Sequence, residues 1–200
     1  ARGYVVDNAN YRLKKMAGVA APAYMEDVAR AIRWIRQNST HVMGDNRRIY
    51  VTGHSAGGYL AAIVCLDKRY LNAVDSSLTD IAACLPISGQ MQTHNTIRKE
   101  LSLGPESEYA PLWYAGQSGQ PFPPFFICAA DSDIKGRVDQ NIQMKERLQQ
   151  SGYKAEYQTM PNRNHTTIVK KAGSADDQIL DAFVRFVHNL EINTPNNQSP

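Results

Sequence analysis

Short apolar runs alternate with amphipathic stretches along most of the chain. Runs such as IYVT at 49–52 and IAACLPI at 81–87 are continuous, which is typical of buried strands. Stretches with apolar residues every three or four positions, such as 178–190, are typical of helices with one buried face. We predict strands over residues 4–8, 49–52, 81–87, 125–130 and 154–159, and helices over residues 22–38, 59–66, 138–150 and 178–190. This alternation predicts an α/β fold, in which helices cover both faces of a mostly parallel sheet.

The length and composition fit a single folding unit. With 200 residues, of which 42% are hydrophobic, the chain is long enough to bury one sizeable core. We expect one domain over residues 1–190 and a polar C-terminal tail over residues 191–200. Residues 94–124 are rich in glycine and proline and are too long for an ordinary connection, so we expect an excursion over one end of the sheet.

The charge balance is mildly basic. The formal net charge is +3 and no cluster of five or more lysines or arginines occurs, so we expect no nucleic-acid partner. No apolar run approaches the roughly 20 residues that span a bilayer, so we expect no membrane association.

The three cysteines, Cys65, Cys84 and Cys128, lie in apolar surroundings without a Cys-x-x-Cys spacing. This predicts buried thiols rather than a disulfide framework or a metal site. Buried thiols favour a reducing, cytoplasmic compartment. The compartment stays open, however, because the chain begins directly on a strand-like pattern and we expect further residues ahead of Ala1.

A Gly-x-Ser-x-Gly sequence, GHSAG at 53–57, stands between a predicted strand and a predicted helix. This is the pattern of a nucleophile elbow, a turn so tight that its serine adopts a strained backbone. We expect Gly53 and Gly57 to avoid collisions that side chains would make with the neighbouring strand and helix. The turn lifts the Ser55 hydroxyl above the strand ends and places a helix N-terminus beneath it, where N–H groups favour negative charge. The sequence therefore predicts Ser55 as a nucleophile, with His54 inside the elbow.

A serine hydroxyl needs a base within hydrogen-bond reach, and the base needs an orienting carboxylate. His165 lies in a loop between the last predicted strand and the last predicted helix, where an imidazole can reach over the serine. The other histidines fit less well. His41 precedes the serine, and His54 would point away from its hydroxyl. No carboxylate follows any strand ahead of His94, and His188 lies on the polar side of the last helix. We therefore predict His165 as the base.

The carboxylate is expected directly after the strand 125–130, where the sequence offers Asp131 and Asp133. Asp131 is the first residue past that strand, and its side chain can anchor the turn through its own backbone. Asp133 reaches further over the strand end. We prefer Asp133 as the acid and keep Asp131 as the alternative.

Several stretches follow one family pattern: NYRL at 10–13, APAYMEDVARAIRWIRQN at 21–38, GDNRRIYVTGHSAGGYLAA at 44–62, DSD at 131–133 and NH at 164–165. They resemble the α/β-hydrolase superfamily, and within it the hormone-sensitive-lipase and carboxylesterase-like branch. The stretches LDKRYL and SGQMQTHNTIRKE are similar to a bacterial esterase subgroup that includes feruloyl-esterase-like proteins. Kynurenine formamidases are similar at a greater distance.

The resemblance spans about residues 3–190 and implies a serine carboxylic-ester hydrolase. Position by position, it implies Ser55 as nucleophile, Asp133 as acid and His165 as base, with the backbone N–H of Ala56 as an oxyanion donor. It implies an acyl-enzyme, a small or aromatic acyl ester as the small-molecule substrate, and neither a metal nor an organic cofactor. The excursion at 94–124 would then lie over the active-site end.

The chain departs from the family pattern ahead of residues 4–8. The family has a His-Gly-Gly stretch there, which supplies further oxyanion donors, and a strand that inserts between those matching 4–8 and 49–52; both are absent. Three explanations stay open: further residues ahead of Ala1, which we favour; direct pairing of 4–8 with 49–52; and a second subunit in a homo-oligomer. The departure also leaves open a catalytically impaired hydrolase-like scaffold or fragment, and the same triad would serve an amidase or formamidase.

Overall fold

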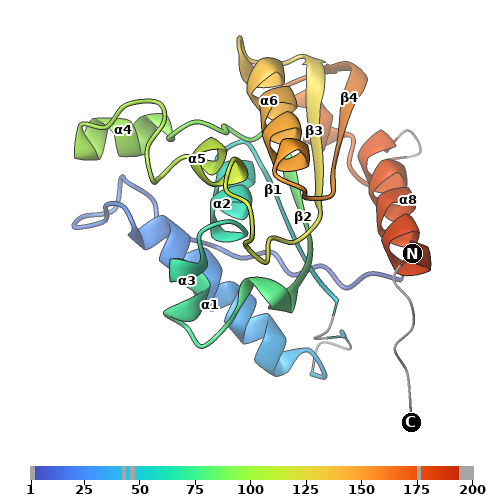
Figure 1. The fold of residues 1–200 in the computed structure, drawn as a ribbon, viewed down its shortest axis with the longest axis horizontal. Helices are drawn as coiled ribbons and strands as arrows, with labels where there is room; N and C mark the ends of the chain where they lie inside the picture. Colours follow the sequence, from blue (N-terminus) through green and yellow to red (C-terminus); the bar gives the residue numbers. More distant parts are fainter. Residues whose placement is uncertain (1–2, 42–43, 46–47, 175–176, 194–200) are drawn as a thin grey trace.

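The computed structural model describes residues 3–41, 44–45, 48–174 and 177–193, and its centre is a parallel sheet (Figure 1). Within these residues four strands stand in the order β1 (Ile49–His54), β2 (Ile81–Ile87), β3 (Phe125–Ser132) and β4 (Ala155–Asn164). The predicted α/β fold is therefore confirmed. Because the strands run in the same direction, their C-terminal ends lie at one edge of the sheet.

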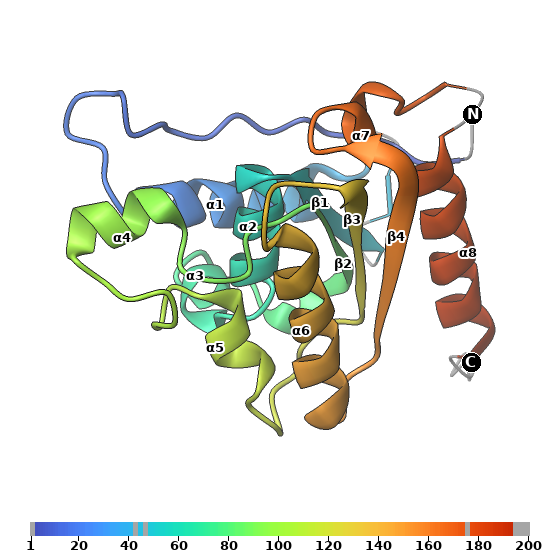
Figure 2. The ribbon, with the colours of Figure 1, turned by 90° about the horizontal axis from the view of Figure 1, so that it is seen from above.

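Helices cover both faces of the sheet, and α8 lies on the opposite side from α1, α2 and α6 (Figure 2). The long helices are α1 (Ala23–Asn38), α2 (Ala56–Val64), α6 (Arg137–Gln150) and α8 (Gln178–Asn193). The short ones are α3 (Lys68–Asn72), α4 (Asn95–Leu101), α5 (Pro111–Ala115), α7 (Thr167–Lys170) and a 3-10 turn at Leu78–Asp80. None of the helices in the described ranges is long and apolar enough to cross a bilayer.

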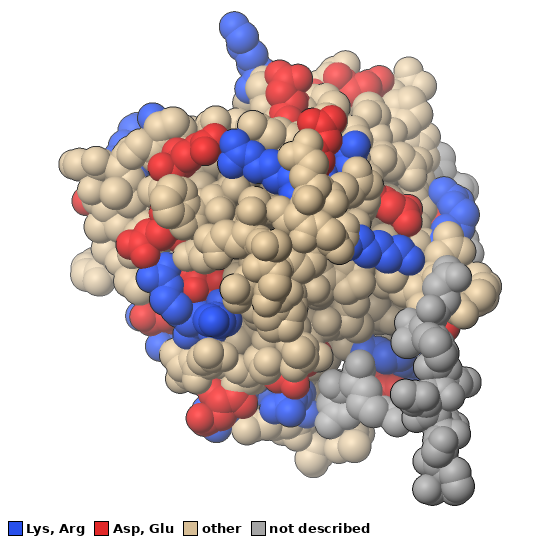
Figure 3. Space-filling view, viewed as in Figure 1, with Lys and Arg blue, Asp and Glu red and all other residues tan. Residues whose placement is uncertain are grey.

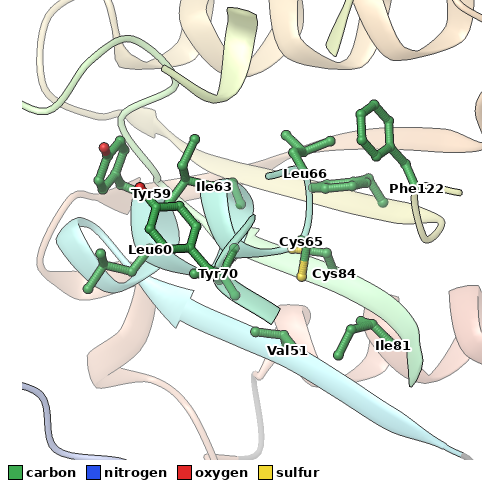
Figure 4. Close-up of a cluster of buried hydrophobic side chains, with 14 of the residues drawn as sticks. Val51, Tyr59, Leu60, Ile63, Cys65, Leu66, Tyr70, Ile81, Cys84 and Phe122 are labelled. Atoms are coloured by element: carbon green, nitrogen blue, oxygen red, sulfur yellow. The ribbon is translucent and has the colours of Figure 1, made fainter. Parts of the chain in front are cut away.

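The core has two parts, one on each face of the sheet. Successive side chains of a strand point to opposite faces, so Phe125 packs toward α2 and α6 while Phe126 packs toward α8. Helix α2 is buried from Gly58 to Val64, which explains its uninterrupted apolar sequence. Cys65 and Cys84 lie next to each other in this layer (Figure 4). All three cysteines are buried and free, as predicted.

Residues 4–8 were predicted as a strand and form none. The Tyr4 ring packs against the rings of Tyr50 and Phe183, with centroids 6.0 and 5.3 Å away, while Val6 is 84% exposed. No backbone hydrogen bond joins residues 4–10 to β1. Direct pairing of this segment with residues 49–52 is therefore wrong, because aromatic packing holds the segment and no strand partner completes a ladder.

Other boundaries differ less. Helix α2 begins at Ala56, directly after the elbow, rather than at residue 59, and β4 continues to Asn164 rather than ending at residue 159. Helix α8 continues to Asn193, so the first part of the predicted polar tail is helical. Residues 194–200 of that tail lie outside the described residues.

The segment 94–124 contains two short helices that the sequence pattern did not predict, α4 and α5. It is tied to the rest of the chain by the Tyr59 hydroxyl, which donates to the Tyr109 carbonyl at 2.7 Å, and by the Leu112 N–H, which donates to the Met91 carbonyl at 3.0 Å. Helix α5 packs beside α6. The segment therefore adds to the α2 and α6 side of the sheet.

Acidic and basic side chains are interspersed on the face shown in Figure 3. Ion pairs also occur among the described residues, such as Arg12 with Asp27 at 2.8 Å and Arg69 with Asp67 at 2.8 Å. The first pair ties the N-terminal segment to α1, and the second lies beside the start of α3. The first pair is partly exposed and contributes little stability by itself. The Asp67 carboxylate of the second pair is buried and also accepts a hydrogen bond from the Tyr114 hydroxyl.

Replacing Phe186 by alanine should lower the free energy of unfolding by about 3–5 kcal/mol. The side chain is 1% exposed and its ring packs on Phe126 at 5.5 Å, so its loss leaves a cavity between α8 and the sheet. Urea unfolding followed by circular dichroism measures the change. The matched control is Ile192→Ala on the same helix, where the side chain is 66% exposed and little change is expected.

Candidate active site

Each strand of the sheet is followed directly by a side chain that takes part in one hydrogen-bonded chain. Ser55 follows β1, Ser88 follows β2, Asp133 follows β3 and His165 follows β4. In parallel sheets, ligands and reactive groups gather outside the C-terminal strand ends. The fold therefore brings together four residues that are up to 110 positions apart in sequence.

The three side chains predicted from the sequence are joined by hydrogen bonds. Nε2 of His165 lies 2.8 Å from Oγ of Ser55, and Nδ1 lies 2.7 Å from Oδ1 of Asp133. With its Nδ1 proton donated to the carboxylate, the neutral imidazole presents the Nε2 lone pair to the serine hydroxyl. The Asp133 side chain is fully buried, whereas that of His165 is 21% exposed.

Ser55 has the strained backbone that the elbow pattern predicts, with φ 56° and ψ −113°. A Cβ on Gly53 would lie 2.4 Å from the Gly57 carbonyl oxygen, which no real structure tolerates. A Cβ on Gly58 would lie 2.9 Å from the carbonyl oxygens of Gly53 and Ile87, whereas one on Gly57 would meet nothing within 4 Å. The expectation for Gly57 is therefore wrong, because Gly58 is the residue that faces the strands.

Ala56 begins helix α2 directly beneath the serine. The first hydrogen bond at this end runs from the Tyr59 N–H to the Ser55 carbonyl at 3.0 Å, so the Ala56 N–H lies outside the helical ladder. The positive end of the helix dipole favours negative charge at this position. The role of Ala56 as an oxyanion donor stays a prediction.

Asp133 accepts hydrogen bonds through both carboxylate oxygens. Oδ1 accepts from His165 and from the Ile134 N–H at 2.8 Å, and Oδ2 accepts from the Ser88 hydroxyl at 2.5 Å and the Ala130 N–H at 3.1 Å. Burial raises the pKa of the carboxyl, but these hydrogen bonds together lower it below its ordinary value. Asp133 is therefore held as a carboxylate.

Asp131, the alternative acid, has a different place. Its carboxylate accepts hydrogen bonds from the N–H groups of Ser132 at 2.8 Å, Asn162 at 2.8 Å and Arg163 at 3.1 Å. These backbone donors lower the pKa of Asp131. Asp131 therefore fastens the end of β3 to the chain just before His165, while Asp133 is the carboxylate that meets the imidazole.

The His54 ring packs against the His165 ring, with centroids 4.6 Å apart. Its Nε2 is buried without a hydrogen-bond partner. Burial, and then the neighbouring His165, lower the pKa of His54, so it is held neutral beside the imidazole that contacts Ser55.

A cavity of about 110 Å³ lies beside the elbow. Six of the residues that line it are Tyr11, Ala56, Tyr59, Leu60, His94 and Ile97. Nδ1 of His94 accepts a hydrogen bond from the Thr96 N–H at 3.3 Å, which leaves the proton of the neutral ring on Nε2. Burial, and then the charge of Arg137, lower the pKa of His94.

No group of three or more potential metal ligands occurs among the described residues.

Two features were missed in the sequence, namely the Ser88 hydroxyl on Asp133 and the link from Asp131 to the His165 loop. Ser88 follows a predicted strand directly, so its place at the same sheet edge was available as a signal. The sequence carried no signal for the partner of this hydroxyl, because that contact depends on the register of β2 against β3.

The chain has known structural neighbours. The esterase Est2 of Thermogutta terrifontis matches with a TM-score of 0.69 at 20% identity, over 94% of this chain and 71% of that one. The acetyl ester-xyloside bifunctional hydrolase of Caldicellulosiruptor lactoaceticus matches with a TM-score of 0.71 at 20% identity, over 91% of this chain and 70% of that one. In sequence, the BD-FAE family model matches residues 1–99. The chain therefore has the fold of these esterase structures.

Among curated proteins, the chain is similar to esterase LipQ of Mycobacterium tuberculosis, at 27% identity over 184 residues. The match covers 82% of this chain and 42% of LipQ, so the chain spans less than half the length of that relative. The similarities agree with the hormone-sensitive-lipase and carboxylesterase-like branch that the sequence motifs resemble.

Gly53→Ala and Gly58→Ala should each lower the free energy of unfolding by about 1–3 kcal/mol or more. In both cases the new Cβ would meet backbone atoms that cannot move aside without displacing the elbow. Gly57→Ala is the matched control, because its Cβ has open space. Urea unfolding of the three variants measures the difference. Equal stability of all three would contradict the packing described for the elbow.

Acidification from about pH 7 to 5 should destabilise the protein through its buried neutral histidines. The pKa values of His54 and His94 are lowered by burial, so the unfolded chain takes up protons first as the pH falls. His94→Asn keeps an acceptor for the Thr96 N–H and removes one titrating group. The unfolding free energy of this variant should therefore fall less between the two pH values than that of the wild type. An equal fall in both proteins would exclude a contribution from His94.

Proposed function

We propose that the chain carries the catalytic machinery of a serine carboxylic-ester hydrolase. The observation that supports this most directly is the hydrogen-bonded chain from Ser55 through His165 to Asp133, with donor–acceptor distances of 2.8 and 2.7 Å. Such a chain supplies the base that a serine hydroxyl requires at neutral pH. The relatives named above as esterases support the same chemistry.

In the proposed reaction, Oγ of Ser55 attacks the ester carbonyl while Nε2 of His165 takes its proton. The Ala56 N–H, at the N-terminus of α2, donates to the oxyanion that develops. His165 then delivers the proton to the departing alkoxide, which leaves an acyl-enzyme on Ser55. In the second half, Nε2 of His165 takes a proton from water while the water oxygen attacks the acyl carbonyl. The bond to Oγ of Ser55 then breaks, His165 returns the proton to Oγ, and the carboxylic acid leaves. Asp133 holds the imidazole in the required tautomer throughout.

The proposed substrate is a small or aromatic acyl ester. The cavity of about 110 Å³ beside Ala56 has room for a compact group, and the rings of Tyr11 and Tyr59 line it. Est2 of Thermogutta terrifontis has been solved with butyrate and with propionate bound, which supports a short acyl group for the proposed enzyme.

The alternative left open by the sequence is a hydrolase-like scaffold with little activity. Losing one oxyanion donor typically costs about 10²–10³-fold in rate, so such a scaffold would hydrolyse esters far more slowly. An amidase with the same triad is distinguished by comparing the best ester with its amide analogue.

Ser55→Ala should lower kcat for p-nitrophenyl butyrate by about 10⁴-fold or more, because the variant lacks the hydroxyl that forms the proposed acyl-enzyme. Release of p-nitrophenolate measures the rate. Ser118→Ala, at an exposed loop serine, is the matched control and should behave as the wild type. Equal rates with and without the Ser55 hydroxyl, or no hydrolysis by the wild type, would support the scaffold instead.

A further inference from the structure

Ser88 is a buried serine whose hydroxyl meets the acid of the proposed triad. It is the first residue after β2, its exposed fraction is 0%, and its Oγ donates to Oδ2 of Asp133 at 2.5 Å. The opposite carboxylate oxygen, Oδ1, faces His165. The hydrogen-bonded chain therefore continues past Asp133 to a fourth side chain.

The main chain of Ser88 is held in a conformation that does not suit serine. Its φ is 49°, in the left-handed region where a Cβ is disfavoured and glycine is preferred. The Ser88 N–H donates to the Cys128 carbonyl at 2.7 Å, and the Ser88 carbonyl accepts from Nη1 of the buried Arg137 at 2.9 Å. The backbone is thus held by hydrogen bonds on both sides. Glycine would suit this conformation better, so the contact of the hydroxyl with Asp133 is the feature that a side chain adds here.

Strained residues gather at this edge of the sheet. Five residues other than glycine have positive φ in the described part of the chain: Ser55, Asp75, Ser88, Ser102 and Asn162. Ser55 is the proposed nucleophile, and the Asn162 N–H contacts Asp131 just before the His165 loop. Such strain persists where the surrounding structure demands it, and it concentrates at functional sites.

Oδ2 of Asp133 has two donors among the described residues, Ser88 and the Ala130 N–H. The Ala130 contact is longer, at 3.1 Å, and its donor lies in β3, the strand that directly precedes Asp133. Without the Ser88 hydroxyl, a fully buried carboxylate oxygen would keep a single backbone donor. A buried carboxylate with too few donors turns toward other partners or takes up a proton.

We propose that Ser88 is a positioning residue, which acts through Asp133 by fixing Oδ2 so that Oδ1 stays aimed at Nδ1 of His165. This inference rests on the proposed hydrolase function, because it assigns Ser88 a part in orienting that triad. Ser88 itself touches no substrate in this scheme. The other charged or titratable groups near Asp133 are His54, Arg137, Cys128 and Tyr157, and none of them donates a hydrogen bond to Oδ2.

Ser88→Gly separates the hydroxyl from the backbone. Glycine accepts the positive φ without strain, so the variant should fold at least as well as Ser88→Ala while lacking the same donor. We expect both variants to lower kcat for p-nitrophenyl butyrate by about 10- to 100-fold, with KM near the wild-type value. Ser88→Cys, with a weak S–H donor, should lie between them and the wild type.

Two further readouts distinguish positioning from a general structural effect. Loss of the donor leaves more charge on the carboxylate, so the Asp133–His165 pair holds its proton more tightly and the acidic limb of kcat/KM moves to higher pH. The proton between Nδ1 of His165 and Asp133 should give a far-downfield NMR resonance that shifts in Ser88→Gly.

The matched control is Ser102→Gly, which makes the same substitution at φ 54° on an exposed serine outside the site. It should leave kcat, the pH profile and the NMR resonance unchanged. Wild-type values for all three in Ser88→Gly would overturn the proposal for Ser88 while leaving the function of Ser55 intact. If the wild type shows no hydrolysis that depends on Ser55, the proposed function fails. An unchanged resonance in Ser88→Gly would then still reject positioning by Ser88.

Discussion

The common direction of four strands is the constraint on which the site depends. Parallel strands end at one edge of the sheet, and each of the four here is followed at once by a member of the same hydrogen-bonded chain, in the strand order Ser55, Ser88, Asp133 and His165. The path of hydrogen bonds runs differently, from Ser55 to His165, then Asp133, then Ser88. It therefore links β1 to β4 above the two strands between them. A slip of one residue in any strand would turn its side chain away from this path.

The elbow shows how tightly the backbone must pack to present a serine at such an edge. Gly53 and Gly58 allow β1 and α2 to approach until a single Cβ would clash, and Ser55 takes up the strained turn between them. Helix α2 then enters the core and is buried along nearly its whole length. Its burial contributes hydrophobic stabilisation that offsets the strain of the turn.

Electrostatics on the two sides of His165 differ. On one side, the buried Asp133 keeps its charge because hydrogen bonds outweigh the cost of burial. On the other, the His54 ring is held neutral and packs against the imidazole. A neutral ring beside His165 adds no competing positive charge when His165 takes a proton. The arrangement suits the serine-hydrolase chemistry proposed above, in which a transient imidazolium is stabilised by one carboxylate.

The sequence by itself determined the alternation of strands and helices, the elbow at Ser55, the loop that carries His165 and the pair of carboxylates after β3. These features rest on local periodicity and on turn chemistry, which neighbouring residues set. Only the tertiary structure decided which carboxylate meets His165, that Gly58 rather than Gly57 faces the strands, that residues 4–8 form no strand, and that Ser88 contacts Asp133. Each of these depends on strand register or on contact between segments far apart in the chain, and a local pattern carries no information about either.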